Sequence, residues 1–110
     1  MMEEKIRALY EEVFLGSNAQ AAERYLAPGY RQHNPGVADG RDGFIKTFAD
    51  AFAAGKKMKL TIVKIVIGEG CAAVLLSRGD NPSPYGDLVD LYRFDESGML
   101  YEHWDVFDGR

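Results

Sequence analysis

The hydrophobic pattern of the chain changes its period once, close to residue 57, and this change most limits the possible folds. Upstream, apolar side chains recur at steps of three and four residues, which is the period of a helix that packs on one face. Downstream, β-branched residues fill short runs that are separated by Gly and Pro, which is typical of strands. The sequence therefore predicts an α+β fold, with helices packed on one face of a largely antiparallel sheet.

Three helices and four strands are predicted from these patterns. The helices cover Glu3–Leu15, Ser17 or Asn18 to Tyr25, and Arg41–Ala54. The strands cover Met58–Ile67, Cys71–Arg78, Leu88–Phe94 and Met99–Phe107. The segment Ala27–Gly40 contains two Pro and three Gly and shows little periodicity, so we expect a loop there.

Composition narrows the possible partners and the location. A chain of 110 residues with 12% aromatic residues indicates one globular domain over residues 1–110. The net charge of −4 disfavours a nucleic-acid partner. No apolar run approaches the ~20 residues of a membrane span, and the charged start does not resemble a signal peptide, so we expect a cytoplasmic domain without a membrane partner. Cys71 is the only cysteine, which excludes an internal disulfide, and we expect it to be a small buried side chain.

Several motifs that bind cofactors or metals are missing from the sequence. There is no Gly-rich phosphate loop and no dinucleotide-binding fingerprint. Neither paired Cys-x-x-Cys motifs nor His-Glu-x-x-His occurs, so we expect no dedicated zinc site.

Two stretches place the only two histidines among polar and aromatic neighbours. The first is Tyr30–Gly36 (Tyr-Arg-Gln-His-Asn-Pro-Gly), and the second is Glu102–Asp105 (Glu-His-Trp-Asp). On a strand, alternation puts His103 and Asp105 on one face with Tyr101 and Phe107, and puts Glu102 and Trp104 on the other. The face with His103 and Asp105 combines polar and aromatic side chains, which is typical of a pocket wall. The alternatives are a plain loop role for His33, a solvated strand face at His103 and Asp105, and simple packing for Trp104.

The register of the last two strands decides which residues share that face. Gly98 suits a left-handed position in the turn at Asp95–Gly98, which sets Asp95 opposite Met99. We therefore expect Leu91 opposite His103 and Val89 opposite Asp105. A loop of different length would shift the pairing by one residue and could bring Asp90 opposite His103. Because Gly98 fits the first register, we do not claim an Asp90–His103 pair.

These motifs resemble the SnoaL-like polyketide cyclases. The resemblance is carried by Tyr30-x-Gln-His-Asn-Pro35, Gly40-Arg-Asp-Gly-Phe44, Val89-Asp-Leu-Tyr-Arg-Phe94 and Glu102-His-Trp-Asp105. That family belongs to the nuclear-transport-factor-2-like superfamily, so the resemblance implies a cone-shaped fold. In such a fold a curved sheet and three helices enclose a pocket. It also implies a homodimer that forms through the convex sheet face, for which Ile62, Val66, Leu76 and Trp104 are candidates.

The resemblance further implies aldol cyclisation or isomerisation of a small apolar or carbonyl-containing molecule, without a metal or an organic cofactor. Asp105 would be the acid/base, and His33 and His103 would be its hydrogen-bonding companions. The expected pocket residues are Tyr30, Asn34, Phe44, Phe48, Tyr92, Tyr101 and Trp104. Asn34 stands before Pro35 where ketosteroid isomerase has its carboxylate base, which disfavours steroid isomerisation. The alternative is a non-catalytic domain that binds a small ligand or serves as a dimeric scaffold.

Overall fold

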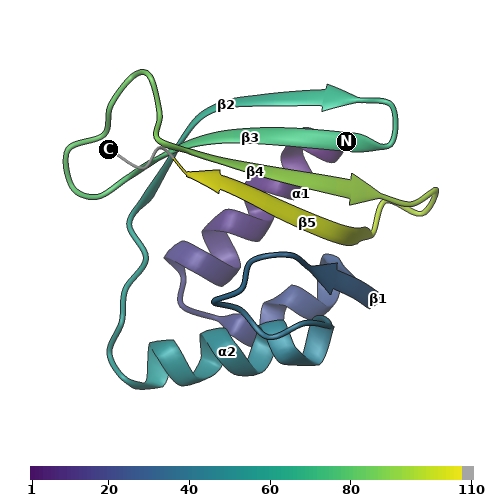
Figure 1. Ribbon diagram of the computed structural model, residues 1–110, viewed down its shortest axis with the longest axis horizontal. Helices are drawn as coiled ribbons and strands as arrows, with labels where there is room; N and C mark the ends of the chain where they lie inside the picture. The colour runs from purple at the N-terminus through teal and green to yellow at the C-terminus, as the bar shows by residue number, and fades with distance from the viewer. Residues whose placement is uncertain (108–110) are drawn as a thin grey trace.

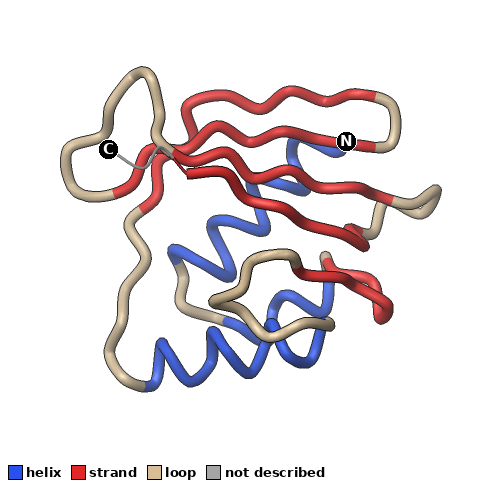
Figure 2. Tube along the Cα trace, viewed as in Figure 1, coloured by secondary structure: helices blue, strands red, loops and turns tan. Residues whose placement is uncertain are grey.

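A curved five-stranded sheet with helices on one side forms the protein (Figures 1 and 2), and the computed structural model describes residues 1–107. The helices are α1 (Met2–Leu9), its continuation η1 (Tyr10–Leu15, a π-helix), the 3-10 helix η2 (Ala19–Arg24) and α2 (Arg41–Ala53). The strands are β1 (Leu26–Gln32), β2 (Leu60–Gly68), β3 (Cys71–Arg78), β4 (Leu88–Phe94) and β5 (Leu100–Phe107). The sheet order is β1-β5-β4-β3-β2. The predicted α+β class is confirmed, as are the three helical regions and the four predicted strands.

The first helix carries the apolar stripe that its sequence predicts, and that stripe faces the concave side of the sheet. Ile6 and Val13 are fully buried, and Leu9 and Tyr10 are 1% exposed. Their partners on the sheet belong to the same core cluster and include Val74, Leu76 and Leu100. Among residues 1–107, no helix is long and apolar enough to cross a membrane.

Strand β1 was not predicted, because its residues lie in the segment expected to be a loop. It runs parallel to β5 at the edge of the sheet, with Gln32 opposite His103. The register is irregular, since the six residues from Leu26 to Arg31 lie along only three residues of β5, Leu100 to Glu102. Pro28 lacks the N–H that a regular ladder needs, so the pattern of a strand is hidden in the sequence.

The hairpin of β4 and β5 has the predicted turn but not the predicted register. Gly98 adopts a φ of 83°, and the backbone N–H of Asp95 donates to the carbonyl oxygen of Met99 at 2.9 Å, as expected. The pairing then shifts between Arg93 and Phe94, where Tyr101 is the extra residue of a β-bulge. The expected pairing of Leu91 with His103 is therefore wrong. Tyr92 lies opposite His103, and Asp90 lies opposite Asp105.

The outer face of the sheet carries a row of apolar residues across four strands. Directly paired positions share a face, and the row is Val66, Ala73, Leu91 and Trp104. Val66 is 53% exposed and Leu91 is 39% exposed. The expectation that Ile62 and Leu76 lie on the convex face and contribute to a dimer contact is wrong. The two residues are paired on the inner face of the sheet, and Leu76 is fully buried. Cys71 is exposed rather than buried, because it begins β3 beside the turn.

Candidate active site

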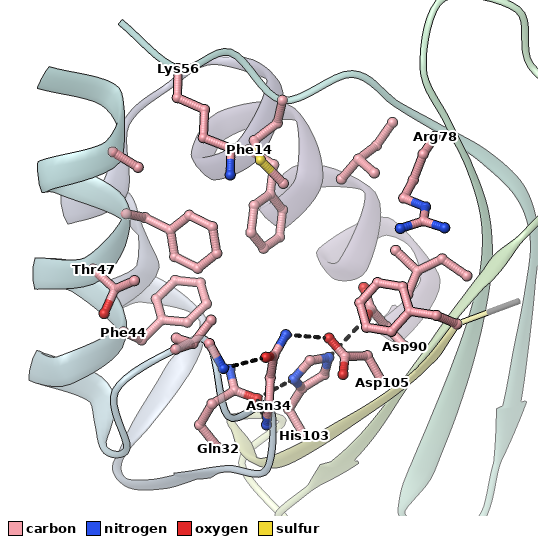
Figure 3. A pocket seen from close by; sticks show the side chains of 18 of the residues that line it. Phe14, Gln32, Asn34, Phe44, Thr47, Lys56, Arg78, Asp90, His103 and Asp105 are labelled. Atoms are coloured by element: carbon pink, nitrogen blue, oxygen red, sulfur yellow. Dashed lines mark hydrogen bonds and ion pairs between the residues drawn. The ribbon is translucent and has the colours of Figure 1, made fainter. Parts of the chain in front are cut away.

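The concave side of the sheet and helix α2 enclose a cavity of about 540 Å³ (Figure 3). This volume lies in the range of ~300–1,000 Å³ that is usual for small-molecule sites. Tyr30, Asn34, Phe44, Phe48 and Tyr92, which the sequence places in a pocket, all line it. Tyr101 and Trp104 do not line it: Tyr101 is the bulged residue, and Trp104 belongs to the outer face.

Aromatic rings form the helical side of the cavity. Phe44 and Phe48 lie one turn apart on α2, with ring centroids 4.6 Å from each other. Phe14 of η1 meets the ring of Phe48 at 5.3 Å in an edge-on arrangement, and Tyr30 of β1 meets the ring of Phe44 at 5.9 Å. Such edge-on contacts are favourable beyond the area that they bury. This side of the cavity therefore suits an apolar or aromatic ligand.

His103 lies at the polar end of the cavity, between Gln32 and Asp90. Its Nδ1 is 2.6 Å from Gln32 Oε1, and its Nε2 is 2.9 Å from Asp90 Oδ1. The orientation of Gln32 is fixed, because its Oε1 accepts from the backbone N–H of Asn34 and its Nε2 donates to the hydroxyl of Tyr30. An amide oxygen therefore faces the ring, so His103 Nδ1 is the donor. His103 Nε2 faces the Asp90 carboxylate, so both ring nitrogens are in hydrogen bonds.

A chain of tyrosines completes the environment of Asp90. Tyr10 donates its hydroxyl proton to Asp90 Oδ2, and the hydroxyl oxygens of Tyr10 and Tyr92 are 2.8 Å apart. Because the proton of Tyr10 is used on Asp90, Tyr92 is the donor in the second bond. Burial first, and then the negative charge of Asp90, raise the pKa of Tyr92 well above its usual value. Burial, Tyr92 and Asp90 do the same to the pKa of Tyr10.

Asp105 is the second carboxylate on this wall. Asn34 Nδ2 donates to its Oδ2 at 2.6 Å, and none of the side chains in residues 1–107 donates to its Oδ1. Tyr30 lines the same cavity and is 1% exposed. Burial first, and then the charges of Asp90 and Asp105, raise the pKa of its hydroxyl. That hydroxyl accepts from Gln32, and within the described part of the chain nothing accepts its proton. The polar end of the cavity thus offers one free carboxylate oxygen and one free O–H donor.

A divalent ion could be held only by the group of Asp90, His103 and Asp105, as far as the described residues show. One ligand atom from each lies within 4.8 Å of the others. The donor set does not favour an ion, because His103 Nε2 faces the Asp90 carboxylate and both oxygens of Asp90 are in hydrogen bonds. A hydrogen-bonded network accounts for the same atoms.

His33 lies on the opposite face of the sheet from this network. Its Nε2 is 2.8 Å from Glu102 Oε2, and its ring is stacked on Trp104 with 4.6 Å between centroids. The expectation that His33 contacts Asp105 is therefore wrong. Gln32 lies opposite His103 on β1, so the next residue along the chain points away from the cavity.

Three polar residues of the network were missed by sequence reasoning, and two of them left a signal. Asp90 alternates with Leu88 and Tyr92, so it was a carboxylate on an otherwise apolar strand face. Gln32 lies inside the Tyr30–Gly36 motif. Tyr10 gave no signal, because its position in the apolar helix stripe predicts only core packing.

Comparison with known proteins agrees with this fold. The family model of the SnoaL-like domain matches residues 6–103. A candidate polyketide cyclase from Acidithiobacillus ferrooxidans is 20% identical in sequence, with a TM-score of 0.75 over 98% of this chain and 88% of that chain. A SnoaL-like protein of unknown function from Burkholderia thailandensis is 11% identical, with a TM-score of 0.79 over 98% of this chain and 94% of that one. Among curated protein sequences, none matches this chain.

Proposed function

The chain belongs to the family of SnoaL-like domains, and on that premise we propose that it moves a proton at the carbon next to a ligand carbonyl, using only its own side chains. The observation that carries this proposal is the position of Asp105. Its carboxylate lies on the cavity wall with Oδ2 held by Asn34 and with Oδ1 available to a ligand. A general base needs this combination of fixed position and a free oxygen within reach of the proton.

In the proposed step, Asp105 Oδ1 takes a proton from the carbon next to the carbonyl. The C–H bond breaks, and its electron pair moves into the carbonyl group to give an enolate. Tyr30 donates its hydroxyl proton as a hydrogen bond to the enolate oxygen, where a fixed donor lowers the barrier. The enolate carbon then attacks a second carbonyl of the same molecule and closes a ring, and Asp105 returns its proton to the alkoxide oxygen that forms there. Alternatively, Asp105 returns the proton to another carbon, which isomerises the ligand.

His103 and Asp90 act as positioning residues in this proposal. Both ring nitrogens of His103 are already in hydrogen bonds, so the ring is held in place rather than free to donate to a ligand. The pair also lies close to the Asp105 carboxylate, since one ligand atom from each of the three residues lies within 4.8 Å of the others.

Deuterium exchange on a simple ketone tests the reaction without knowledge of the natural ligand. The probe is 2-tetralone in D₂O at pH 7, and proton NMR follows the loss of signal at the carbons next to its carbonyl. We expect the protein to accelerate exchange and Asp105→Asn to lower the acceleration by about 10²–10⁴-fold, the usual contribution of a general base. The matched control is Asp50→Asn, because Asp50 pairs with Lys46 on the exposed side of α2. Equal exchange by Asp105→Asn and by the unmodified protein, both folded by circular dichroism, would refute the proposal.

A second candidate is a domain that binds a small ligand without transforming it. It is favoured by the network of Tyr10, Asp90, His103 and Gln32, in which the hydrogen bonds already connect the members to one another. Saturable binding of 2-tetralone with no acceleration of exchange would select this candidate.

We also propose that a second copy of the chain covers the outer face of the sheet. The apolar row from Val66 to Trp104 supports this, because exposed apolar surface of this kind marks contact sites. Light scattering after size-exclusion chromatography should give the mass of a dimer, and Leu91→Lys should shift it to a monomer. A monomer in the unmodified protein at ~100 μM would contradict the proposal.

A further inference from the structure

Basic side chains gather at the exposed end of the cavity. Lys56, Lys57 and Lys59 lie between α2 and β2, Arg78 ends β3, and all four line the cavity and are exposed. Figure 3 shows Lys56 and Arg78 at one end of the cavity, Lys56 on the helical side and Arg78 on the sheet side, with Asn34 and His103 at the other end. The chain as a whole carries a net charge of −4, so this gathering runs against its overall charge.

Acidic residues offset only part of this charge. Lys59 Nζ lies 2.5 Å from Asp80 Oδ1, and Arg78 Nε lies 3.2 Å from Asp87 Oδ2. Within residues 1–107, no carboxylate lies within ion-pair distance of Lys56. None of residues 1–107 accepts a hydrogen bond from either Nη atom of Arg78.

Arg78 is held in a fixed position at this end of the cavity. Its guanidinium carbon lies 4.9 Å from the centroid of the Phe107 ring, which also lines the cavity. The carboxylate of Asp87 accepts from both the backbone N–H and the Nε of Arg78. The two Nη atoms remain as donors in a planar fork, which matches the oxygens of an anionic group.

We propose that the ligand of this cavity carries an anionic group, such as a carboxylate, at the end remote from its reacting carbonyl. The anion lies between Lys56 and Arg78, the apolar body packs on Phe14, Phe44 and Phe48, and the carbonyl lies beside Asp105. The orientation of the carbonyl rests on the proposed function. The substrate class is therefore an amphipathic keto acid rather than a neutral ketone.

The experiment compares two probes that share one ring system and differ in one charge. They are 8-anilinonaphthalene-1-sulfonate and the neutral N-phenyl-1-naphthylamine. Dissociation constants are taken from amide NMR shifts of Met58 and Gly79, which line the cavity, so that binding on the outer face does not enter. We expect the sulfonate probe to bind about twofold to thirtyfold more tightly than the neutral probe, which is the effect of two partly exposed ion pairs.

The variants compare the same change of charge at two places. Lys56→Gln with Arg78→Gln should abolish the preference for the sulfonate probe. Lys46→Gln with Lys64→Gln is the control, because neither lysine lines the cavity. The control should keep the preference, and raising NaCl from 50 to 500 mM should weaken only the sulfonate probe.

Three results would overturn the inference: equal affinity of the unmodified protein for both probes, the same preference in both double variants, or no cavity shifts with the sulfonate probe. The anion site and the proposed reaction can fail independently of each other. A preference that depends on Lys56 and Arg78 without any ketone exchange keeps the anion site and removes the proposed reaction. Ketone exchange without a preference for the sulfonate probe keeps the proposed reaction and removes the anion site.

Discussion

Raising the pH above 10 should unfold this protein through three buried tyrosines. Burial is the main cause that raises the pKa values of Tyr10, Tyr30 and Tyr92 above their ordinary value of 10.0. In the unfolded chain these hydroxyls are solvated and ionise near pH ~10. Above that pH the unfolded chain loses protons that the folded chain keeps. The contribution to stability is fully present below pH ~10 and is lost as the pH rises toward the folded-state pKa values.

The size of the effect follows from the number of protons. Each tyrosine that stays protonated only in the folded state lowers the free energy of unfolding by about 1.4 kcal/mol for every pH unit above 10. Three such residues give about 4 kcal/mol for each unit. A domain of ordinary stability, about 5–15 kcal/mol, therefore loses much or all of it between about pH 11 and pH 13.

Urea unfolding followed by circular dichroism at pH 9, 10 and 11 measures the slope. Absorbance at 295 nm in the same samples reports tyrosinate, and the part of it that comes from the three buried tyrosines should rise together with unfolding. Tyr92→Phe should reduce the slope by about one third, because it removes one of the three protons. Tyr85→Phe, at a side chain that is 85% exposed, is the matched control for the substitution itself. A free energy of unfolding that stays constant from pH 9 to 11, or a slope that Tyr92→Phe does not change, would refute the reasoning.

Three further substitutions test individual features of the structure. Tyr10→Phe removes a buried hydrogen bond to the charged Asp90 and should lower the free energy of unfolding by about 1.5–3 kcal/mol in urea at pH 7; no loss would mean that the bond does not form. Gly86→Ala should cost more than about 1 kcal/mol and lower the melting temperature, because φ is +73° and an added Cβ would lie 2.6 Å from Leu75 Cδ1; an unchanged melting temperature contradicts this backbone geometry. His33→Ala should leave exchange of 2-tetralone unchanged, since His33 faces away from the cavity, and a loss of exchange would place it back in the site.

The helical half of the fold was predictable because its information is local. The apolar stripe of the first helix and the stop at Gly16 lie within a few residues of each other, so periodicity alone finds the helix. Strand β1 was not predictable in this way. Its pairing to β5 absorbs extra residues around Pro28, and it depends on contacts with a segment about 70 residues away.

The site was predictable in part, for a related reason. Alternation along one strand places His103 and Asp105 on the same face, and both line the cavity. The position of His33 depends on strand β1, which the sequence hid. Once Gln32 is paired with His103, the side chain of His33 must point to the other face and meet Glu102.

The β-bulge at Tyr101 explains why Asp90 joins the site although the turn was predicted correctly. Without the extra residue, the pairing of Phe94 with Leu100 would continue along the strands and place Trp104 opposite Asp90. Asp90 is held on the inner face by its pairing with Val74 of β3, so His103 and Asp105 would then point to the outer face. The bulge shifts β5 by one residue, so that Asp90 and Asp105 lie opposite each other on the cavity side. The turn cannot specify this, because the shift satisfies distant partners: Tyr10 donates to Asp90, and Asn34 donates to Asp105.

The helix that supplies Tyr10 is irregular at the same place. Its α-helical turns end at Leu9, and Tyr10 begins the π-helical segment η1, whose wider turns absorb extra residues. A bulged strand and a widened helix therefore both direct a side chain toward Asp90, and both kinds of irregularity occur often at functional sites. A core that only had to pack would not need either one. The two distortions are best understood as the structural cost of burying a carboxylate with all of its hydrogen-bond partners in place.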